Sequence, residues 1–195
     1  MAIFRPSVST GGSKAPFLGF KEINFLKVEE PEPKPEWADI YWNIECEVEG
    51  SQYTNTLRVS GSLERDAEGN LVDCGLLKRL YYFLDCINFD GGLDIQGNWV
   101  NQAGDPIPDV LAELNTSYMK REGQRGYMAY GYIFKEQPKN PTDKPYTKIQ
   151  SKVVQNTPQA RKELEEYIKF MKEKKHLREA DDSNQGQSAR PTTPF

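Results

Sequence analysis

Residues that build metal sites, disulfides and catalytic triads are scarce in this sequence. Among its 195 residues are three cysteines, Cys46, Cys74 and Cys86, and a single histidine, His176. No C-x-x-C or H-x-x-x-H pair is present, which argues against a zinc site, and three widely spaced cysteines argue against a disulfide framework. The histidine follows two lysines where a helix is expected to end, so its charge suits the helix dipole better than a catalytic triad.

Long apolar runs and nucleotide-binding motifs are missing as well. No stretch of about 18 apolar residues occurs, so we expect no membrane-spanning segment and no membrane partner. Residues 1–12 lack the basic and apolar regions of a secretory signal, and we therefore expect a cytoplasmic protein. Because no Walker loop, G-x-G-x-x-G or G-x-S-x-G is found, we predict a protein without cofactor, metal site or catalytic activity.

Charge is distributed unevenly along the chain. Twenty-five Lys and Arg stand against 29 Asp and Glu, which gives a net charge of −4. Residues 29–119 hold five basic and eighteen acidic side chains, whereas residues 120–175 hold fourteen basic and seven acidic ones. A whole-chain charge of −4 argues against a nucleic-acid partner, but the basic segment offers a local surface for an anionic polymer.

Hydrophobic periodicity predicts five strands and two long helices. Alternation is clearest over residues 38–48, where every second side chain is apolar. Leucines spaced by three and four residues predict an amphipathic helix over residues 74–89, with Asp73 as its N-cap. Thr157 followed by Pro158 is typical of a helix start. The expected order is strands at 17–28, 38–48 and 53–63, a helix at 74–89, strands at 126–137 and 146–155, and a final helix.

Three strands, a helix, two strands and a C-terminal helix predict a mainly β fold with helices. This order is that of an OB-fold-like five-stranded barrel with its helix between strands 3 and 4. Other small barrels and α+β sheets have a similar order of strands and helices along the chain, and the order of strands within a sheet is not visible in a sequence. We expect a flexible N-terminal arm at residues 1–16, an OB-like nucleic-acid-binding domain at 17–178 and a disordered C-terminal tail at 179–195.

Basic and aromatic residues interleave along the last two predicted strands. A surface for single-stranded DNA requires cations along a phosphate track and flat rings on which bases stack. Residues 120–153 supply both, and the candidate DNA-binding residues are Arg125, Tyr127, Tyr130, Tyr132, Phe134, Lys135, Lys144, Tyr146, Lys148 and Lys152. Tyr130, Tyr132 and Phe134 share a parity that suits either a groove or a core. Aromatic residues also favour strands, and lysines protect sheet edges, so both interpretations stay open.

Two runs in these strands carry a resemblance to a known family. Gly126-Tyr127-Met128-Ala129-Tyr130-Gly131-Tyr132 and Lys144-Pro145-Tyr146-Thr147-Lys148-Ile149 resemble the closing hairpin of phage single-stranded-DNA-binding proteins with an OB-fold. Residues 155–162 are similar to the segment that follows this hairpin in that family. Residues 75–87 are similar to the helix that follows its third strand, so the resemblance spans roughly residues 17–178. It implies a non-catalytic protein that binds and protects single-stranded DNA during phage DNA replication or recombination, in the cytoplasm of the infected cell.

The C-terminus carries a second, separate hint. The chain ends on Phe195 after a polar stretch, and many single-strand-binding proteins end in a mobile acidic tip whose terminal phenylalanine recruits partner enzymes. The spacer and the phenylalanine match that pattern, whereas Asp181 and Asp182 lie well back from the tip. We expect Phe195 to bind replication or recombination proteins, and a frayed terminus is the alternative.

Two other functions stay open at this point. One is a phage structural or accessory protein whose aromatic face docks a protein partner. The other is a small metal-dependent nuclease that uses the carboxylates between Asp85 and Asp109, although the glycines there are more typical of a solvated loop. Within that loop Trp99 is expected to lie against the protein body, and a helical turn is expected at residues 110–114.

Overall fold

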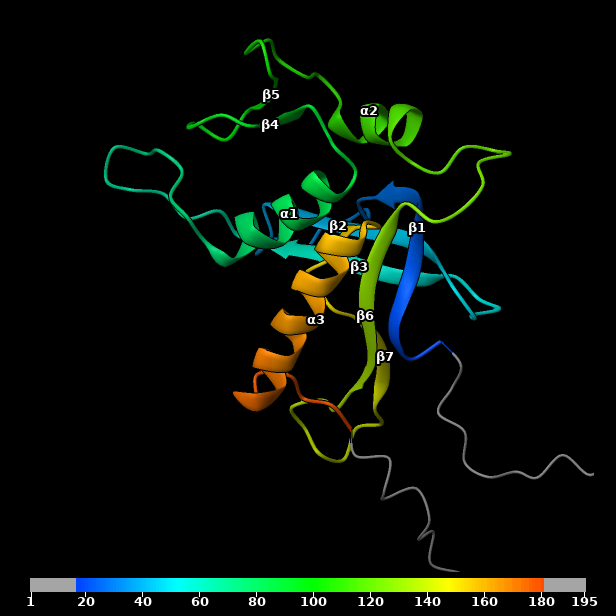
Figure 1. The fold of residues 1–195 in the computed structure, drawn as a ribbon. Coiled ribbons are helices and arrows are strands. Elements are labelled where there is room, and N and C mark those ends of the chain that lie inside the picture. The colour runs from blue at the N-terminus through cyan, green and yellow to red at the C-terminus, as the bar shows by residue number, and fades with distance from the viewer. Residues whose placement is uncertain (1–16, 181–195) are drawn as a thin grey trace, which may run out of the picture.

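The computed structural model describes residues 17–180 (Figure 1). In that part of the chain six strands form one sheet, two short strands form a separate hairpin, and there are three helices. The sheet strands are β1 (Gly19–Glu29), β2 (Ile40–Val48), β3 (Asn55–Gly61), β6 (Ala129–Glu136), β7 (Tyr146–Ile149) and β8 (Val154–Gln155). The other elements are β4 (Gly91–Leu93), β5 (Trp99–Asn101), α1 (Gly75–Cys86), α2 (Val110–Ser117) and α3 (Pro158–Glu173). The predicted mainly β class with helices is confirmed.

The sheet has the strand order of a Greek key. Its order is β3-β2-β1-β6-β7 with antiparallel neighbours, and β8 pairs with β6. β1, β2 and β3 form a meander, and β6 returns through a long connection to lie beside β1. The helix expected between strands 3 and 4 is α1, and the expected C-terminal helix is α3. The order of these elements is the one expected from the sequence.

The sheet does not close into the predicted five-stranded barrel. Within the described residues no hydrogen-bonded pairing joins β3 to β7, the two edge strands. The fifth strand expected over residues 146–155 is interrupted at 150–153, so the sheet has six strands where five were expected. Gln150 and Val153 are both buried there, and because their parities differ, one regular strand could not bury both on the same face.

β1 bends so that it serves both halves of the sheet. Residues 19–23 pair with β6, and residues 23–29 pair with β2. The register against β2 shifts between Phe25 and Lys27, and such a bulge adds a residue and increases the local bend. In Figure 1, β1 and β6 therefore stand upright while β2 and β3 cross behind them.

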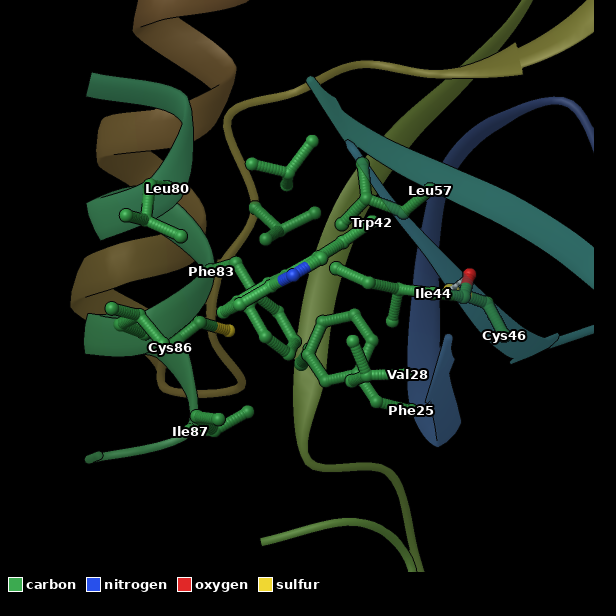
Figure 2. Close-up of a cluster of buried hydrophobic side chains, with 14 of the residues drawn as sticks. Phe25, Val28, Trp42, Ile44, Cys46, Leu57, Leu80, Phe83, Cys86 and Ile87 are labelled. Atoms are coloured by element: carbon green, nitrogen blue, oxygen red, sulfur yellow. Dashed lines mark hydrogen bonds between the residues drawn. The ribbon is translucent and has the colours of Figure 1, made fainter. Parts of the chain in front are cut away.

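One face of the sheet packs on α1. Phe83 of α1 is fully buried and meets Phe25 of β1 edge to face, with the ring centroids 5.1 Å apart. Figure 2 shows these rings converging with Trp42, Ile44 and Leu57 from β2 and β3. The alternation that predicted β2 is thus the alternation between this core and the outer surface.

α3 covers the opposite face of β6. Successive residues of a strand point to opposite sides of the sheet, so Ile133 lies in the core under α1 while Tyr132 and Phe134 lie in a second cluster. Leu164 and Ile168 of α3 complete that second cluster and are 0% and 1% exposed. The aromatic row of β6 is therefore enclosed between the sheet and a helix.

The N-cap predicted from the sequence is observed at α3 but not at α1. Thr157 caps α3, because its side chain accepts a hydrogen bond from a backbone N–H of the first turn. α1 has Cys74 at its N-cap with no side-chain hydrogen bond, so the prediction of Asp73 as N-cap is wrong. Asp73 instead forms an ion pair with Lys78 (3.2 Å). The helical turn expected at residues 110–114 is part of α2.

Three turns of one sequence pattern shape the acidic middle of the chain. Each has Asp or Asn, two variable residues, Gly, and again Asn or Asp, at residues 66–70, 94–98 and 101–105. In each, the first side-chain oxygen accepts hydrogen bonds from the N–H groups two and four residues later. The glycines have φ values of +87°, +88° and +87°, which other residues rarely adopt. The expected loop therefore contains the β4–β5 hairpin, whose Trp99 stacks on Trp42 at 5.5 Å.

Candidate nucleic-acid interface

The two edge strands of the open sheet border a groove. β3 and β7 face each other across it, and residues 176–178, which follow α3, form a further wall. Its volume is about 760 Å³. Because an edge strand leaves its outward N–H and C=O groups without ladder partners, both walls also offer backbone hydrogen-bonding groups.

Basic side chains dominate the groove. Among the described lining residues Glu136 is the single carboxylate, and it stands against four cations from four different segments: Arg58, Arg79, Lys148 and Arg178. Arg79 of α1 is held by the Ser60 carbonyl oxygen, to which it donates a hydrogen bond (2.9 Å). Arg58 of β3 lies over the ring of Tyr41, 5.1 Å from its centroid. The groove thus has the charge that an anionic polymer requires.

Glu136 holds two of these cations. It is 5% exposed, and its carboxylate accepts hydrogen bonds from Lys148 Nζ (2.8 Å), Arg178 Nη2 (3.3 Å) and the Tyr146 hydroxyl (2.5 Å). Burial by itself would raise the pKa of Glu136, but the hydrogen bonds from Lys148 and Tyr146 and the charge of Arg178 lower it. The hydrogen bond to Glu136 in turn raises the pKa of Tyr146. One ionised carboxylate therefore joins β6, β7 and the segment after α3.

Exposed aromatic rings flank the cations on both sides. Tyr146 of β7 is half exposed at the groove. Beyond Arg58, Tyr41 of β2 meets Trp37 edge to face with the centroids 5.8 Å apart, and Trp37 is 59% exposed. Cations beside exposed rings are the combination that holds the phosphates and bases of a single strand. We refer to the groove together with Tyr41 and Trp37 as the candidate interface.

Three of the sequence-predicted residues lie in the groove. Tyr146 and Lys148 line it, as does Phe134, which pairs with Lys148 across β6 and β7. Phe134 is only 5% exposed, so it supports the floor of the groove rather than offering a free ring. Lys144 is exposed in the turn that leads into β7.

Two predicted stacking residues lie under α3. Tyr132 is 7% exposed, and Tyr130 donates its hydroxyl hydrogen bond to Glu165 of α3 (3.2 Å). Phe20 of β1 continues this row, with its ring 4.8 Å from that of Tyr132 and 5.9 Å from that of Tyr130. Of the two interpretations of this row, the core holds for Tyr132, whereas Tyr130 is half-buried and Phe134 lies at the floor of the groove. While α3 is in place, Tyr132 has no face on which a base could stack.

The remaining predicted residues are dispersed. Lys152 lies over two tyrosine rings, one from α1 and one from α3, at 5.5 Å and 4.4 Å. Lys135 is half-buried in β6 and does not line the groove. Arg125 and Tyr127 belong to the loop before β6 and do not line it either. The cationic residues of this one segment of the sequence are thus found on several separate surfaces.

The chain still pairs with the sheet where the C-terminal tail was expected to begin. Glu179 accepts a hydrogen bond from the Tyr132 hydroxyl (2.5 Å), and the Ala180 N–H donates to the Lys135 carbonyl oxygen (2.9 Å). The predicted arm at residues 1–16 and the predicted partner-binding residue Phe195 lie outside the described residues.

Sequence reasoning missed five residues of the candidate interface: Trp37, Tyr41, Arg58, Arg79 and Arg178. Alternation along β3 indicates that Arg58 points away from the core, and this signal was available. That β3 then lies opposite β7 follows from the Greek-key order, and a sequence pattern does not contain that information.

The acidic middle of the chain is used for turns and caps. Within residues 17–180 no three His, Cys, Asp or Glu side chains gather as metal ligands. Asp94 serves its own turn, and the hydrogen bonds that it receives from Asn98 lower its pKa. Asp109 caps α2, and Asp90 accepts a hydrogen bond from the Tyr118 hydroxyl (2.6 Å). These carboxylates are thus occupied by backbone and side-chain donors.

Comparison with known proteins returns no match. The chain matches no protein-family model, no curated protein and no solved structure. No helix within residues 17–180 is long and apolar enough to cross a bilayer. A function for the chain must therefore rest on the chemistry of the candidate interface.

Proposed function

We propose that this protein binds and protects single-stranded DNA, without catalysis, at the candidate interface. The observation that supports the proposal is the groove between β3 and β7, where four cations and a half-exposed ring lie between two open strand edges. The cations neutralise phosphates and release condensed counterions. Tyr146 on one side and Trp37 with Tyr41 on the other offer rings to unpaired bases.

A single strand fits this surface better than a duplex. Base stacking on side-chain rings requires bases that are free of a partner, and each stacked base contributes about 1–3 kcal/mol. Direct readout of a duplex in its major groove instead uses a helix or a two-stranded ribbon that enters the groove. The rings of the candidate interface lie beside a recessed groove, which suits a flexible chain.

The distribution of acidic residues favours the groove as the location of the DNA. Part of the candidate interface belongs to residues 29–119, but Asp90, Asp94 and Asp105 of that segment lie in or next to the β4–β5 hairpin, which projects at the top of Figure 1, whereas β7 lies in its lower half. Like charges repel phosphates from the acidic region. The strand is therefore directed to the groove.

The setting of this activity is proposed from the family resemblance. On that basis the protein acts in the cytoplasm of an infected bacterial cell, during phage DNA replication or recombination. Phe195 at the end of the chain then binds replication or recombination proteins.

Titration of a fluorescently labelled dT oligonucleotide with the full chain tests the proposal. Salt-sensitive binding with intact oligonucleotide, accompanied by quenching of tyrosine and tryptophan emission, is the expected result. Absence of binding at low salt would refute it and favour a protein-docking role. Parallel titrations with and without magnesium distinguish binding from cleavage, because loss of the oligonucleotide only with magnesium would indicate a nuclease.

A further inference from the structure

Glu136 is a buried carboxylate in a groove whose other charged side chains are cations. It lies between Lys148 of β7 and Arg178 of the segment after α3, at 2.8 Å and 3.3 Å. Two cations from separate segments that converge on one anion form the arrangement in which proteins also hold phosphates. The carboxylate thus stands where an anionic ligand of this groove would be bound.

The other two cations of the groove differ in this respect. Among the described ion pairs none includes Arg58 or Arg79. Arg58 lies over the Tyr41 ring and donates a hydrogen bond to Asn43 Oδ1 (3.2 Å), and Arg79 donates one to the Ser60 carbonyl oxygen. In the free protein half of the groove's cations are therefore neutralised and half are available.

We propose that Glu136 is an internal counter-anion: in the free protein it takes the place of a DNA phosphate between Lys148 and Arg178, and it thereby limits the affinity of the groove for single-stranded DNA. This inference rests on the proposed function. A phosphate at this position must displace the carboxylate, so Lys148 and Arg178 contribute little to phosphate neutralisation in the native chain. Their release would add up to two phosphate contacts.

Glu136→Gln is the direct test. The amide keeps the size of the side chain and an acceptor for Tyr146, but it removes the charge. For single strands the slope of log K against log salt steepens by about 0.7 for each phosphate neutralised. If the affinities converge at about 1 M salt, the variant binds labelled dT about 4-fold more tightly at about 0.15 M with one cation freed, and about 14-fold with two.

Glu166→Gln is the matched control. Glu166 is exposed on α3 and does not line the groove, so its substitution changes the net charge equally and leaves Lys148 and Arg178 paired. Glu136→Asp keeps the charge with a shorter side chain, and its salt slope should stay near that of the wild type. Circular dichroism and thermal unfolding establish that each variant is folded.

A second measurement leaves Glu136 in place. Lys148→Gln should flatten the salt slope by clearly less than Arg58→Gln, for which a loss of about 0.7 is expected. Equal losses from the two variants would overturn the inference, as would a Glu136→Gln variant that binds like Glu166→Gln or more weakly than the wild type. In each of these cases the wild type still binds DNA, whereas a wild type without binding refutes the proposed function as well.

Discussion

Leu164→Ala tests whether α3 keeps the aromatic row of β6 inside the protein. Leu164 is fully buried against the cluster that contains Tyr132 and Phe134. Truncation of a buried leucine to alanine costs about 2–5 kcal/mol, through lost apolar contact and the cavity that remains. Because α3 buries only Leu164 and Ile168 completely, its neighbours can relax into the cavity. We therefore expect a loss of about 2–3 kcal/mol in the free energy of unfolding.

Urea denaturation followed by circular dichroism measures this loss. Phe170→Ala is the matched control, because Phe170 lies on the same helix, is 50% exposed and should change the stability by less than about 0.5 kcal/mol. A loss for Leu164→Ala as small as that of the control would contradict a docked α3. Tyr132 and Phe134 would then again be candidates for base stacking.

The buried thiols, the repeated turn and the groove carboxylate each give a further expectation. Burial raises the pKa of Cys46 and Cys86 to about 12, so neither should react with a thiol reagent at about pH 8 until the protein unfolds. Rapid labelling of either of these two residues in the folded chain, located by peptide mapping, would contradict this. Asp94→Ala removes three hydrogen bonds from the turn at 94–98 and should lower the free energy of unfolding by about 1 kcal/mol in a urea titration, whereas an unchanged midpoint would show that the side chain does not stabilise the turn. Because the pKa of Glu136 is lowered, the stability that this carboxylate contributes to the fold is fully present above the ordinary pKa of 4.5. This contribution is lost as the pH falls through the lowered pKa. Below about pH 4.5 the free energy of unfolding of Glu136→Gln should therefore fall less steeply than that of the wild type. Parallel curves of the free energy of unfolding against pH would show that ionised Glu136 does not stabilise the fold.

Hydrophobic periodicity was sufficient to locate the long elements. β2 appears as a strict alternation because one face packs on α1 and the other is turned outward. The Thr157-Pro158 pair marks the start of α3 because capping is a local interaction. The interruption at residues 150–153 was not predicted, since burial of both Gln150 and Val153 depends on tertiary packing.

The candidate site was predicted only in part, for a similar reason. Alternation along β7 separates Tyr146 and Lys148 from Ile149. The structure places the first two at the groove, whereas Ile149 belongs to the core and borders the groove as a buried side chain. The same reasoning applied to β6 gives the correct shared parity of Tyr132 and Phe134, but it cannot show that α3 covers them. A helix that is distant in sequence decides whether an aromatic row is a surface or a core.

If single-stranded DNA binds in the groove between β3 and β7, removal of cations from the groove must weaken the binding. The double variant Arg58→Gln/Arg79→Gln removes the two cations of the groove that have no described ion pair. Lys162→Gln/Lys169→Gln on the exposed side of α3 makes the same change in net charge away from the groove. Fluorescence anisotropy with labelled dT should show about 14-fold weaker binding for the groove variant at about 0.15 M salt and a salt slope flatter by about 1.4. Equal Kd values and equal slopes for the two variants would show that the DNA does not bind in this groove.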